Sequence, residues 1–164
     1  MNSYKFDFVN YLKGILEKCV VYEGEYTPPE TYLKFYHNFK SLENIQADSH
    51  VFPCVYLDEP FRINYIKKQS GALFHKYTFT LVFMDESNLE ETADDYYAIA
   101  LKFEDPIRQF ISKLKKFSDE NGYDFNVLIE GEPIGYPFIN MFDVNVSGMI
   151  VDFVLTVEYN KPIC

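Results

Sequence analysis

The side chains that could do chemistry are dispersed along the chain. Carboxylates gather at Glu90, Glu91, Asp94 and Asp95, where a helix is expected to begin. A general acid–base pair needs two carboxylates in a cleft with separated pKa values. Acidic residues in a first helical turn are explained more simply by the positive end of the helix dipole and by solvation. We therefore predict no catalytic or metal-binding role for this acidic cluster.

The histidines form no recognisable ligand set. His37, His50 and His75 lack a Cys, Asp or Glu partner at the spacing of a zinc site. His75 lies on the apolar face of an expected strand, and we interpret it as a core or interface histidine. The chain also has no GxSxG nucleophile motif and no glycine-rich phosphate loop. We expect no enzymatic activity, no catalytic residue, no cofactor and no metal.

Composition and charge limit the classes of partner. The 164 residues are 48% hydrophobic and 18% aromatic, which argues against disorder. With 25 acidic and 15 basic residues the net charge is -10, which disfavours nucleic-acid binding. No apolar run approaches the ~20 residues of a membrane span, and we expect neither a signal peptide nor a membrane contact. Three separated thiols favour a reduced, intracellular protein without disulfides: Cys19, Cys54 and Cys164.

The first half of the chain predicts one helix and two strands. Residues 5–20 have apolar positions at helical spacing and predict an amphipathic helix. Residues 32–39 fit either a short helix or an irregular aromatic segment. Residues 51–57 predict a strand, with Pro53 at an edge or at the strand start. Residues 73–84 alternate strictly, which predicts a long strand with one apolar face.

A long helix is predicted next, over residues 88–117. Ser87 and Glu90 have the spacing of a capping box, and Asn121-Gly122 would end the element. Pro106 interrupts the pattern, so we favour one kinked helix, with a new helix capped by Asp105 as the alternative. One helical phase relates the apolar residues expected to pack on the sheet: Ala93, Ala100, Phe103, Ile107, Phe110 and Leu114.

The last part of the chain predicts two or three strands. Residues 125–129 alternate, and 131–137 are expected to form a turn. Residues 142–146 and 149–159 alternate with opposite parity, so an irregularity is required at Ser147-Gly148. We favour a β-bulge there over a tight turn. The chain is therefore predicted to be a single α+β domain (1–164) with a mostly antiparallel sheet, a long helix packed on one face and an N-terminal amphipathic helix.

The segment 60–72 is a candidate interaction site. It lies between two strong strands, where a hairpin is expected, and it is too long for a tight turn. It carries 3 of the 15 basic residues of an otherwise acidic chain. We predict a protruding arm that meets acidic surface on a neighbouring copy; a solvated loop is the alternative. The predicted contact residues are Arg62, Tyr65, Lys67 and Lys68.

The order of these elements is similar to that of a known family. An amphipathic helix leads to the short strand at 52–57 (FPCVYL), a β-arm that ends at 77–83 (YTFTLVF), a capped helix and a final strand at 148–157 (GMIVDFVLTV). This order, over residues 5–20 and 51–159, resembles the tail terminator (tail completion) and minor tail proteins of tailed bacteriophages. Segment 21–50 departs from it, being longer and more aromatic.

The resemblance implies a structural virion protein that is made in the host cytoplasm. It implies a homo-oligomeric ring, commonly a hexamer, that caps the tail tube and joins it to the neck or head–tail connector. The sheet would surround a lumen through which DNA passes without specific binding, and arms would contact the next subunit and the tube. Two alternatives remain open: an aromatic-lined ligand-binding domain and an acidic interaction domain such as a DNA mimic.

Overall fold

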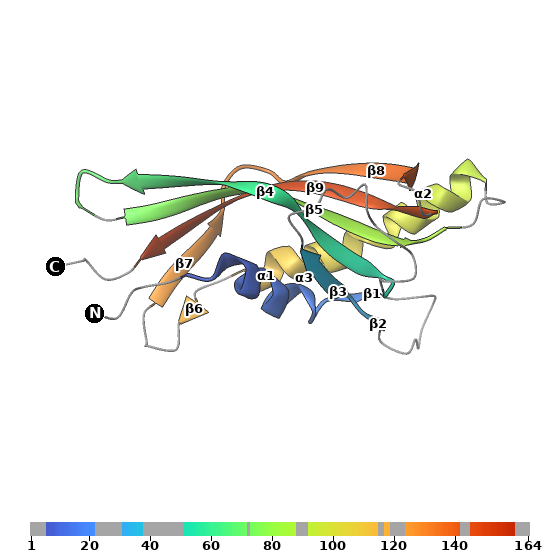
Figure 1. Ribbon diagram of the computed structural model, residues 1–164, viewed down its shortest axis with the longest axis horizontal. Coiled ribbons are helices and arrows are strands. Elements are labelled where there is room, and N and C mark those ends of the chain that lie inside the picture. Colours follow the sequence, from blue (N-terminus) through green and yellow to red (C-terminus); the bar gives the residue numbers. More distant parts are fainter. Residues whose placement is uncertain are drawn as a thin grey trace.

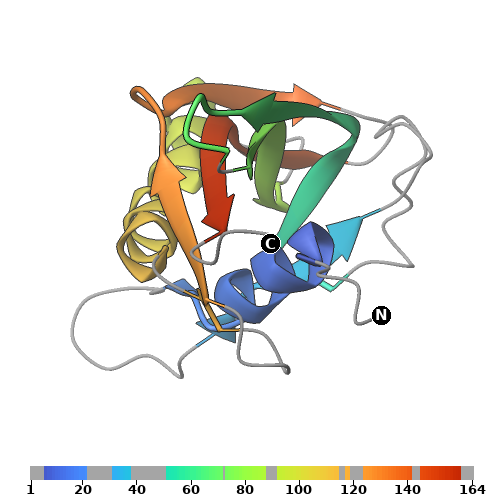
Figure 2. The ribbon, with the colours of Figure 1, turned by 90° about the vertical axis from the view of Figure 1, so that its left-hand side faces the viewer.

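A curled sheet forms most of the molecule, and helices α1 and α3 lie on its concave side (Figures 1 and 2). The computed structural model describes residues 6–21, 31–37, 51–71, 73–87, 92–114, 117–118, 124–141 and 145–159. This confirms a mixed, strand-rich α+β chain. The helices are α1 (Phe8–Leu16), α2 (Ala93–Leu101) and α3 (Glu104–Lys113). The strands are β1 (Val20–Val21), β2 (Thr31–Tyr32), β3 (Lys34–His37), β4 (Cys54–Lys67), β5 (Leu73–Glu86), β6 (Phe117–Ser118), β7 (Asp124–Ile129), β8 (Ile134–Met141) and β9 (Val146–Tyr159).

The main sheet is built around β5 and β9, which pair along almost their whole length. Its strand order is β3-β4-β5-β9-β7-β6, and β8 also pairs with β9. Strands β7 and β8 lie end to end along one edge of β9, because Ile129 pairs with Leu155 and Ile134 with Asp152. Within the described residues, no helix is long and apolar enough to cross a membrane.

The predicted N-terminal helix is confirmed, although it is shorter than residues 5–20. The carboxylate of Asp7 caps it by accepting the backbone N–H of Asn10 at 3.1 Å, which satisfies one free donor of the first turn. Its buried face holds Phe8, Tyr11, Leu12 and Leu16, so the helix is amphipathic as expected.

The aromatic segment at 32–39 was predicted wrongly. Lys34–His37 is strand β3, and it pairs in parallel with Cys54–Leu57 of β4. Every other strand pair is antiparallel among the described residues. A four-residue strand whose partner lies about twenty residues away gives little local signal, since pairing decides its conformation. The strand predicted over residues 51–57 begins later, at Cys54, directly after Pro53, and continues to Lys67.

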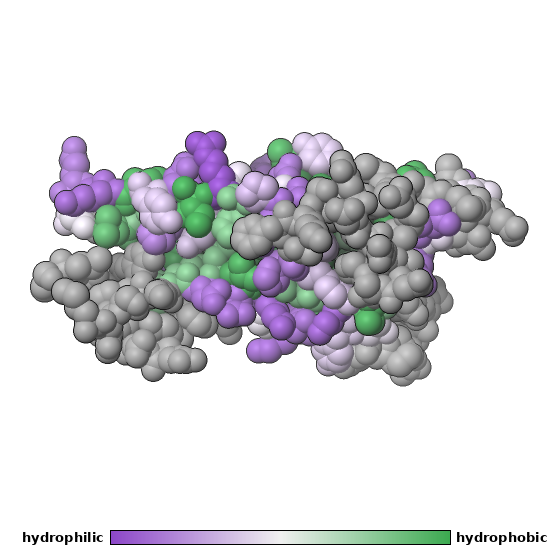
Figure 3. All heavy atoms as spheres, in the orientation of Figure 1, coloured by the Kyte–Doolittle hydropathy of each residue, from purple (hydrophilic) through white to green (hydrophobic). Residues whose placement is uncertain are grey.

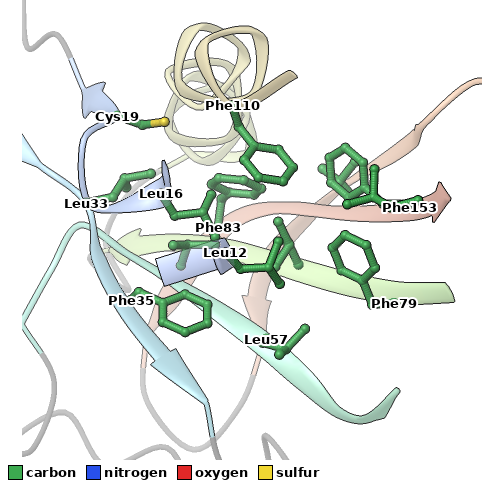
Figure 4. Packing of buried hydrophobic residues seen from close by; sticks show 14 of the residues in the cluster. Leu12, Leu16, Cys19, Leu33, Phe35, Leu57, Phe79, Phe83, Phe110 and Phe153 are labelled. Carbon is green, nitrogen blue, oxygen red and sulfur yellow. The ribbon is translucent and has the colours of Figure 1, made fainter. Parts of the chain in front are cut away.

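The face of the sheet that packs on α1 and α3, here called the inner face, carries the main core. Alternate residues of β5 and β9 point into it, as the sequence predicted, and Figure 4 shows them meeting Leu12 of α1 and Phe110 of α3. The rings of Phe79 and Phe153 stack on neighbouring strands with centroids 5.5 Å apart. Both side chains are less than 4% exposed, so they contribute to the hydrophobic stabilisation of the core.

The single long helix predicted over 88–117 is wrong. The chain forms α2 and α3 instead, with a break at Lys102 and Phe103. Pro106 has no N–H to bond the carbonyl of Lys102, and its ring would clash with that carbonyl in a continuous helix. Pro106 sits in the first turn of α3, where an N–H has no intrahelical acceptor. The apolar residues on the two sides of the break still face the core, as the helical spacing predicted, since Ala100, Phe103 and Phe110 are fully buried.

The predicted cap of this region is also wrong. Thr92 is the N-cap of α2, and it forms a capping box with Asp95 rather than Ser87 with Glu90. The Thr92 hydroxyl accepts the Asp95 N–H at 3.4 Å, and the Asp95 carboxylate accepts the Thr92 N–H at 2.9 Å. Residues 88–91 and 121–122 lie outside the described residues.

The C-terminal strands correct two further predictions. The turn is shorter than 131–137, because β8 begins at Ile134. Strand β9 pairs with β5 without a shift through Ser147 and Gly148; the bulge lies opposite, in β8, between Phe138 and Met141. We call the opposite face of the sheet the outer face. The alternation of apolar residues changes phase because Val146 packs in a second apolar cluster on this outer face. Residues 142–144 are outside the described part.

Candidate assembly surface: an arm and an acidic groove

The segment predicted to protrude is the end of the β4–β5 hairpin. We call this end the arm: Arg62–Lys67 of β4 and Leu73–Thr78 of β5, paired in register. Figure 1 shows it at the opposite end of the sheet from α2. Strand β9 follows the β5 side of the arm as far as Phe74, which pairs with Glu158. The far edge of β4 between Arg62 and Lys67 has no strand partner among the described residues, so its backbone groups remain open to pairing.

The four predicted contact residues lie on different surfaces of the arm. Ile63 packs toward the core, so Tyr65 and Lys67, at alternate positions from it, belong to the inner face. Arg62 belongs to the outer face. Tyr65 is 72% exposed, and its ring meets His75 edge-on at 4.7 Å between centroids. Burial lowers the pKa of His75, which favours a neutral ring beside the tyrosine.

The cations of the arm differ in what they already bind. The Lys68 ammonium lies 2.8 Å from the Glu158 carboxylate and 5.2 Å from the centre of the Phe74 ring. The Arg62 Nε donates a hydrogen bond to the Asn64 side-chain oxygen at 3.1 Å. Among the described residues, no carboxylate lies within ion-pair distance of Arg62 or Lys67. Lys68 is therefore engaged within its own chain, whereas Lys67 is exposed and available. Figure 3 shows hydrophilic side chains at this end of the molecule.

An acidic groove opens on the outer face at the base of the arm. Between Asp58 and Arg62, β4 bulges away from its register with β5, and residues 130–133 interrupt the edge formed by β7 and β8. Both irregularities border the same groove of about 430 Å³. Its lining is Asp58, Pro60, Phe61, Arg62, Thr78, Phe79, Thr80, Glu130, Glu132, Ile134, Asp152, Phe153 and Val154.

Two carboxylates face each other across the floor of this groove. Asp58 of β4 pairs with Thr80 of β5, which pairs with Asp152 of β9, so the three form a row across the sheet. The Thr80 hydroxyl donates to Asp152 at 2.6 Å. Partial burial raises the pKa of Asp58, and the nearby charge of Asp152 raises it further. The row therefore favours a positively charged guest.

A buried carboxylate occupies the β4 bulge on the opposite side from the groove lining. The Glu59 side chain is 3% exposed, and its Oε1 lies 3.5 Å from Nδ1 of His37 on β3. Its Oε2 is buried and has no hydrogen-bond partner in the part of the chain that the structure describes. This contact ties the end of β3 to β4 beyond their last backbone pair.

The residues first considered for chemistry have structural positions. Asp95 serves the α2 cap, and its hydrogen bonds with Thr92 lower its pKa. Cys19 and Cys54 are buried and unpaired, which confirms the prediction for these two thiols; burial raises the pKa of Cys19 to about 11 and that of Cys54 further. Cys164, His50, Glu90 and Glu91 lie outside the described residues. Within the described part, no three His, Cys, Asp or Glu side chains are placed to hold a metal ion.

Sequence reasoning found the arm and missed the groove. Asp58, Glu130 and Asp152 are isolated polar residues in or beside three apolar strands, and they come together through strand pairing alone. The available signal was that Asp152 is a polar residue at an alternate position of an otherwise apolar strand. This pattern predicts that the side chain points outward, but it does not predict which residues lie beside it.

Comparison with protein-family models and with curated proteins found no match to this chain. Its function is therefore argued from the arm, the groove and the charge of the chain.

Proposed function

We propose that this chain is a structural virion subunit of a tailed bacteriophage, a tail terminator or neck protein that assembles into a ring between tail tube and head. The observation that carries the proposal is the arm. It presents, at one end of a firmly packed sheet, an exposed tyrosine together with a strand edge and a lysine that have no partner among the described residues. Tyrosine is enriched at protein interfaces, and an open strand edge invites pairing with another chain.

The charge of the chain suits this role. Six copies at a net charge of -10 each would carry about -60 before counterions bind. Phosphate affinity depends on Lys and Arg, so an acidic ring lets DNA pass without holding it. Like-charged subunits repel at low ionic strength, which makes locally basic contact residues such as Lys67 necessary for assembly.

The partners of the proposed ring are further copies of this chain, the tail tube and the neck or connector proteins. The proposal includes no enzymatic activity, no cofactor and no membrane contact. In this role the carboxylates of the groove act in recognition, through their charge.

Native mass spectrometry and light scattering over a range of protein and salt concentrations test the proposal. We expect a closed species of one stoichiometry, six by the family resemblance, whose stability increases with moderate salt as subunit repulsion is screened. Negative-stain images should show rings with a central opening. A chain that stays monomeric at high concentration in moderate salt would show the proposal to be wrong.

The groove favours one second candidate, an acidic interaction module for a basic peptide. Four carboxylates line the groove, so a cationic ligand suits it better than the flat apolar ligand of an aromatic-lined site. Titration of the monomer with a synthetic lysine-rich peptide separates the candidates. Saturable, salt-sensitive binding by a chain that never self-assembles would support the module, and ring formation without peptide binding would reject it.

A further inference from the structure

Within the described part of the chain, the charges that line the groove are mostly negative. Its lining holds the carboxylates of Asp58, Glu130, Glu132 and Asp152 and one cation, Arg62, so the formal balance is 1 − 4 = -3. Lys76 does not line the groove, but its ammonium lies 2.5 Å from the Glu130 carboxylate and neutralises the charge of that carboxylate only. In the described part, the row from Asp58 to Asp152 receives a hydroxyl from Thr80 but no cation.

The arm offers the complementary groups. Tyr65 and Lys67 are two residues apart on one strand, so their side chains leave the same face of the arm side by side. Tyr65 has the largest exposed fraction of the exposed apolar or aromatic residues in the described part. The groove has an apolar wall for such a ring, formed by Pro60 and Ile134, beside the carboxylates.

We propose that the arm of one subunit docks in the outer-face groove of the next subunit. Tyr65 would pack against the apolar wall and Lys67 would lie between Asp58 and Asp152. This inference rests on the proposed self-assembly, and it names the two surfaces that meet. A volume of about 430 Å³ is within the range of sites that enclose a drug-sized group, and is suited to an aromatic ring with a lysine beside it.

The positions of the two surfaces favour a ring. Tyr65 and Lys67 leave the inner face of the sheet, whereas the groove is open on the outer face. Two different surfaces therefore meet, and an open row of subunits keeps a free arm on one terminal subunit and a free groove on the other. Such a head-to-tail contact forms a closed ring when the rotation between neighbours closes and an open filament when it does not, and the proposed function requires the ring.

Charge reversal at each surface tests the inference. Lys67→Glu places a negative charge on the arm, and Asp152→Lys places a positive charge in the groove; both positions are exposed, so the fold should tolerate both changes. We expect each variant to need about tenfold or more protein for half-assembly than the unmodified chain. Lys13→Glu, on the exposed side of α1, makes the same net-charge change as Lys67→Glu and should assemble like the parent.

Mixing the two variants gives the sharper result. In an equimolar mixture, the acidic arm of one variant matches the basic groove of the other, and the unmodified arm and groove match as well. We expect assembly to return as an alternating ring that holds equal numbers of the two variants, which native mass spectrometry counts by mass. The double variant in one chain should likewise assemble alone. Urea unfolding midpoints confirm that each variant is folded.

The outcomes separate this inference from the proposed function. Absence of any oligomer of the unmodified chain would reject both. If the unmodified chain forms rings and both variants form them equally well, the ring stands and the arm–groove contact is wrong. If both variants dissociate and their mixture stays dissociated, the two residues serve different contacts, which also overturns the inference.

Discussion

The two faces of the central sheet have opposite characters, although the same strands carry both. In β9, Phe153 and Leu155 point inward and are no more than 1% exposed, while Asp152 and Glu158 point outward and carry charge. The inner face is closed by α1 and α3 and holds the fold together. The outer face near the arm contributes little apolar burial, so its residues are free to change with a partner surface. Effects of substitution on stability should therefore concentrate in the part of the inner face that α1 and α3 cover, and effects on assembly at the arm and the groove.

The outer face is itself divided. At the end away from the arm, a second cluster packs around Tyr56, Val82 and Met84, each no more than 5% exposed. At the arm end, ion pairs such as Lys68 with Glu158 replace apolar contacts. One end of the outer face thus continues the core, and the other end resembles an interface without its partner.

The largest expected difference is between an aromatic side chain of the core and one of the arm. Phe103 is fully buried, with its ring 6.0 Å from that of Phe83. We expect Phe103→Ala to lower the free energy of unfolding by about 3–5 kcal/mol. Tyr65→Ala should cost less than about 1 kcal/mol, because the exposed ring loses one cross-strand contact. Urea unfolding of both variants checks this, and equal losses would contradict the division between the core and the arm.

Two glycines should respond in opposite ways to substitution by alanine: the added methyl group should lower the free energy of unfolding at one and raise it at the other. A Cβ at Gly148 would lie 1.9 Å from the Phe83 carbonyl oxygen, so β5 and β9 would have to separate. We expect Gly148→Ala to cost about 3 kcal/mol or more. Gly14, inside α1, has no atom within 4 Å of such a Cβ. Gly14→Ala should raise stability by about 0.5–1 kcal/mol. Thermal and urea unfolding measure both, and a loss at Gly14 would contradict the model of an open helix surface there.

The smallest expected effect concerns Asp58 in the groove. Its pKa is raised in the folded protein, so the folded state binds this proton more tightly than the unfolded state does. Stability due to this group is therefore lost as pH rises from the ordinary pKa of 3.8 through the raised value. Asp58→Asn avoids the loss and should stabilise the monomer at neutral pH, by less than about 1 kcal/mol because solvent screens the site.

The same variant should weaken assembly if the groove receives Lys67. A residue with a purely structural role would change both properties in one direction. Unfolding curves of monomeric protein should differ between variant and parent at about pH 7 and coincide at about pH 3, where Asp58 is protonated in both states. A variant that is less stable at neutral pH would show that Asp58 serves the fold.

Predictions from the sequence succeeded where a pattern is local. Alternation in β5 and β9 identified the inward residues, and helical spacing identified the buried face of α1 and of the region from Ala100 to Phe110. Side-chain direction in a strand or a helix follows from the backbone of that segment alone, so it can be read without knowing any partner. The hairpin was predicted from the position of segment 60–72 between two strong strands.

The remaining features required the tertiary structure, because they depend on contacts between distant segments. The pairing of β3 with β4 turned an aromatic segment into a strand, and a second cluster on the outer face, rather than a bulge in β9, explained the change of parity at Val146. The groove depends on which residues of β4, β5 and β9 share a row. Strand order and register set that row, and the alternation within any one strand is compatible with many registers. The sequence alone thus determined which side chains face outward, and the three-dimensional pairing decided that Asp58 and Asp152 meet.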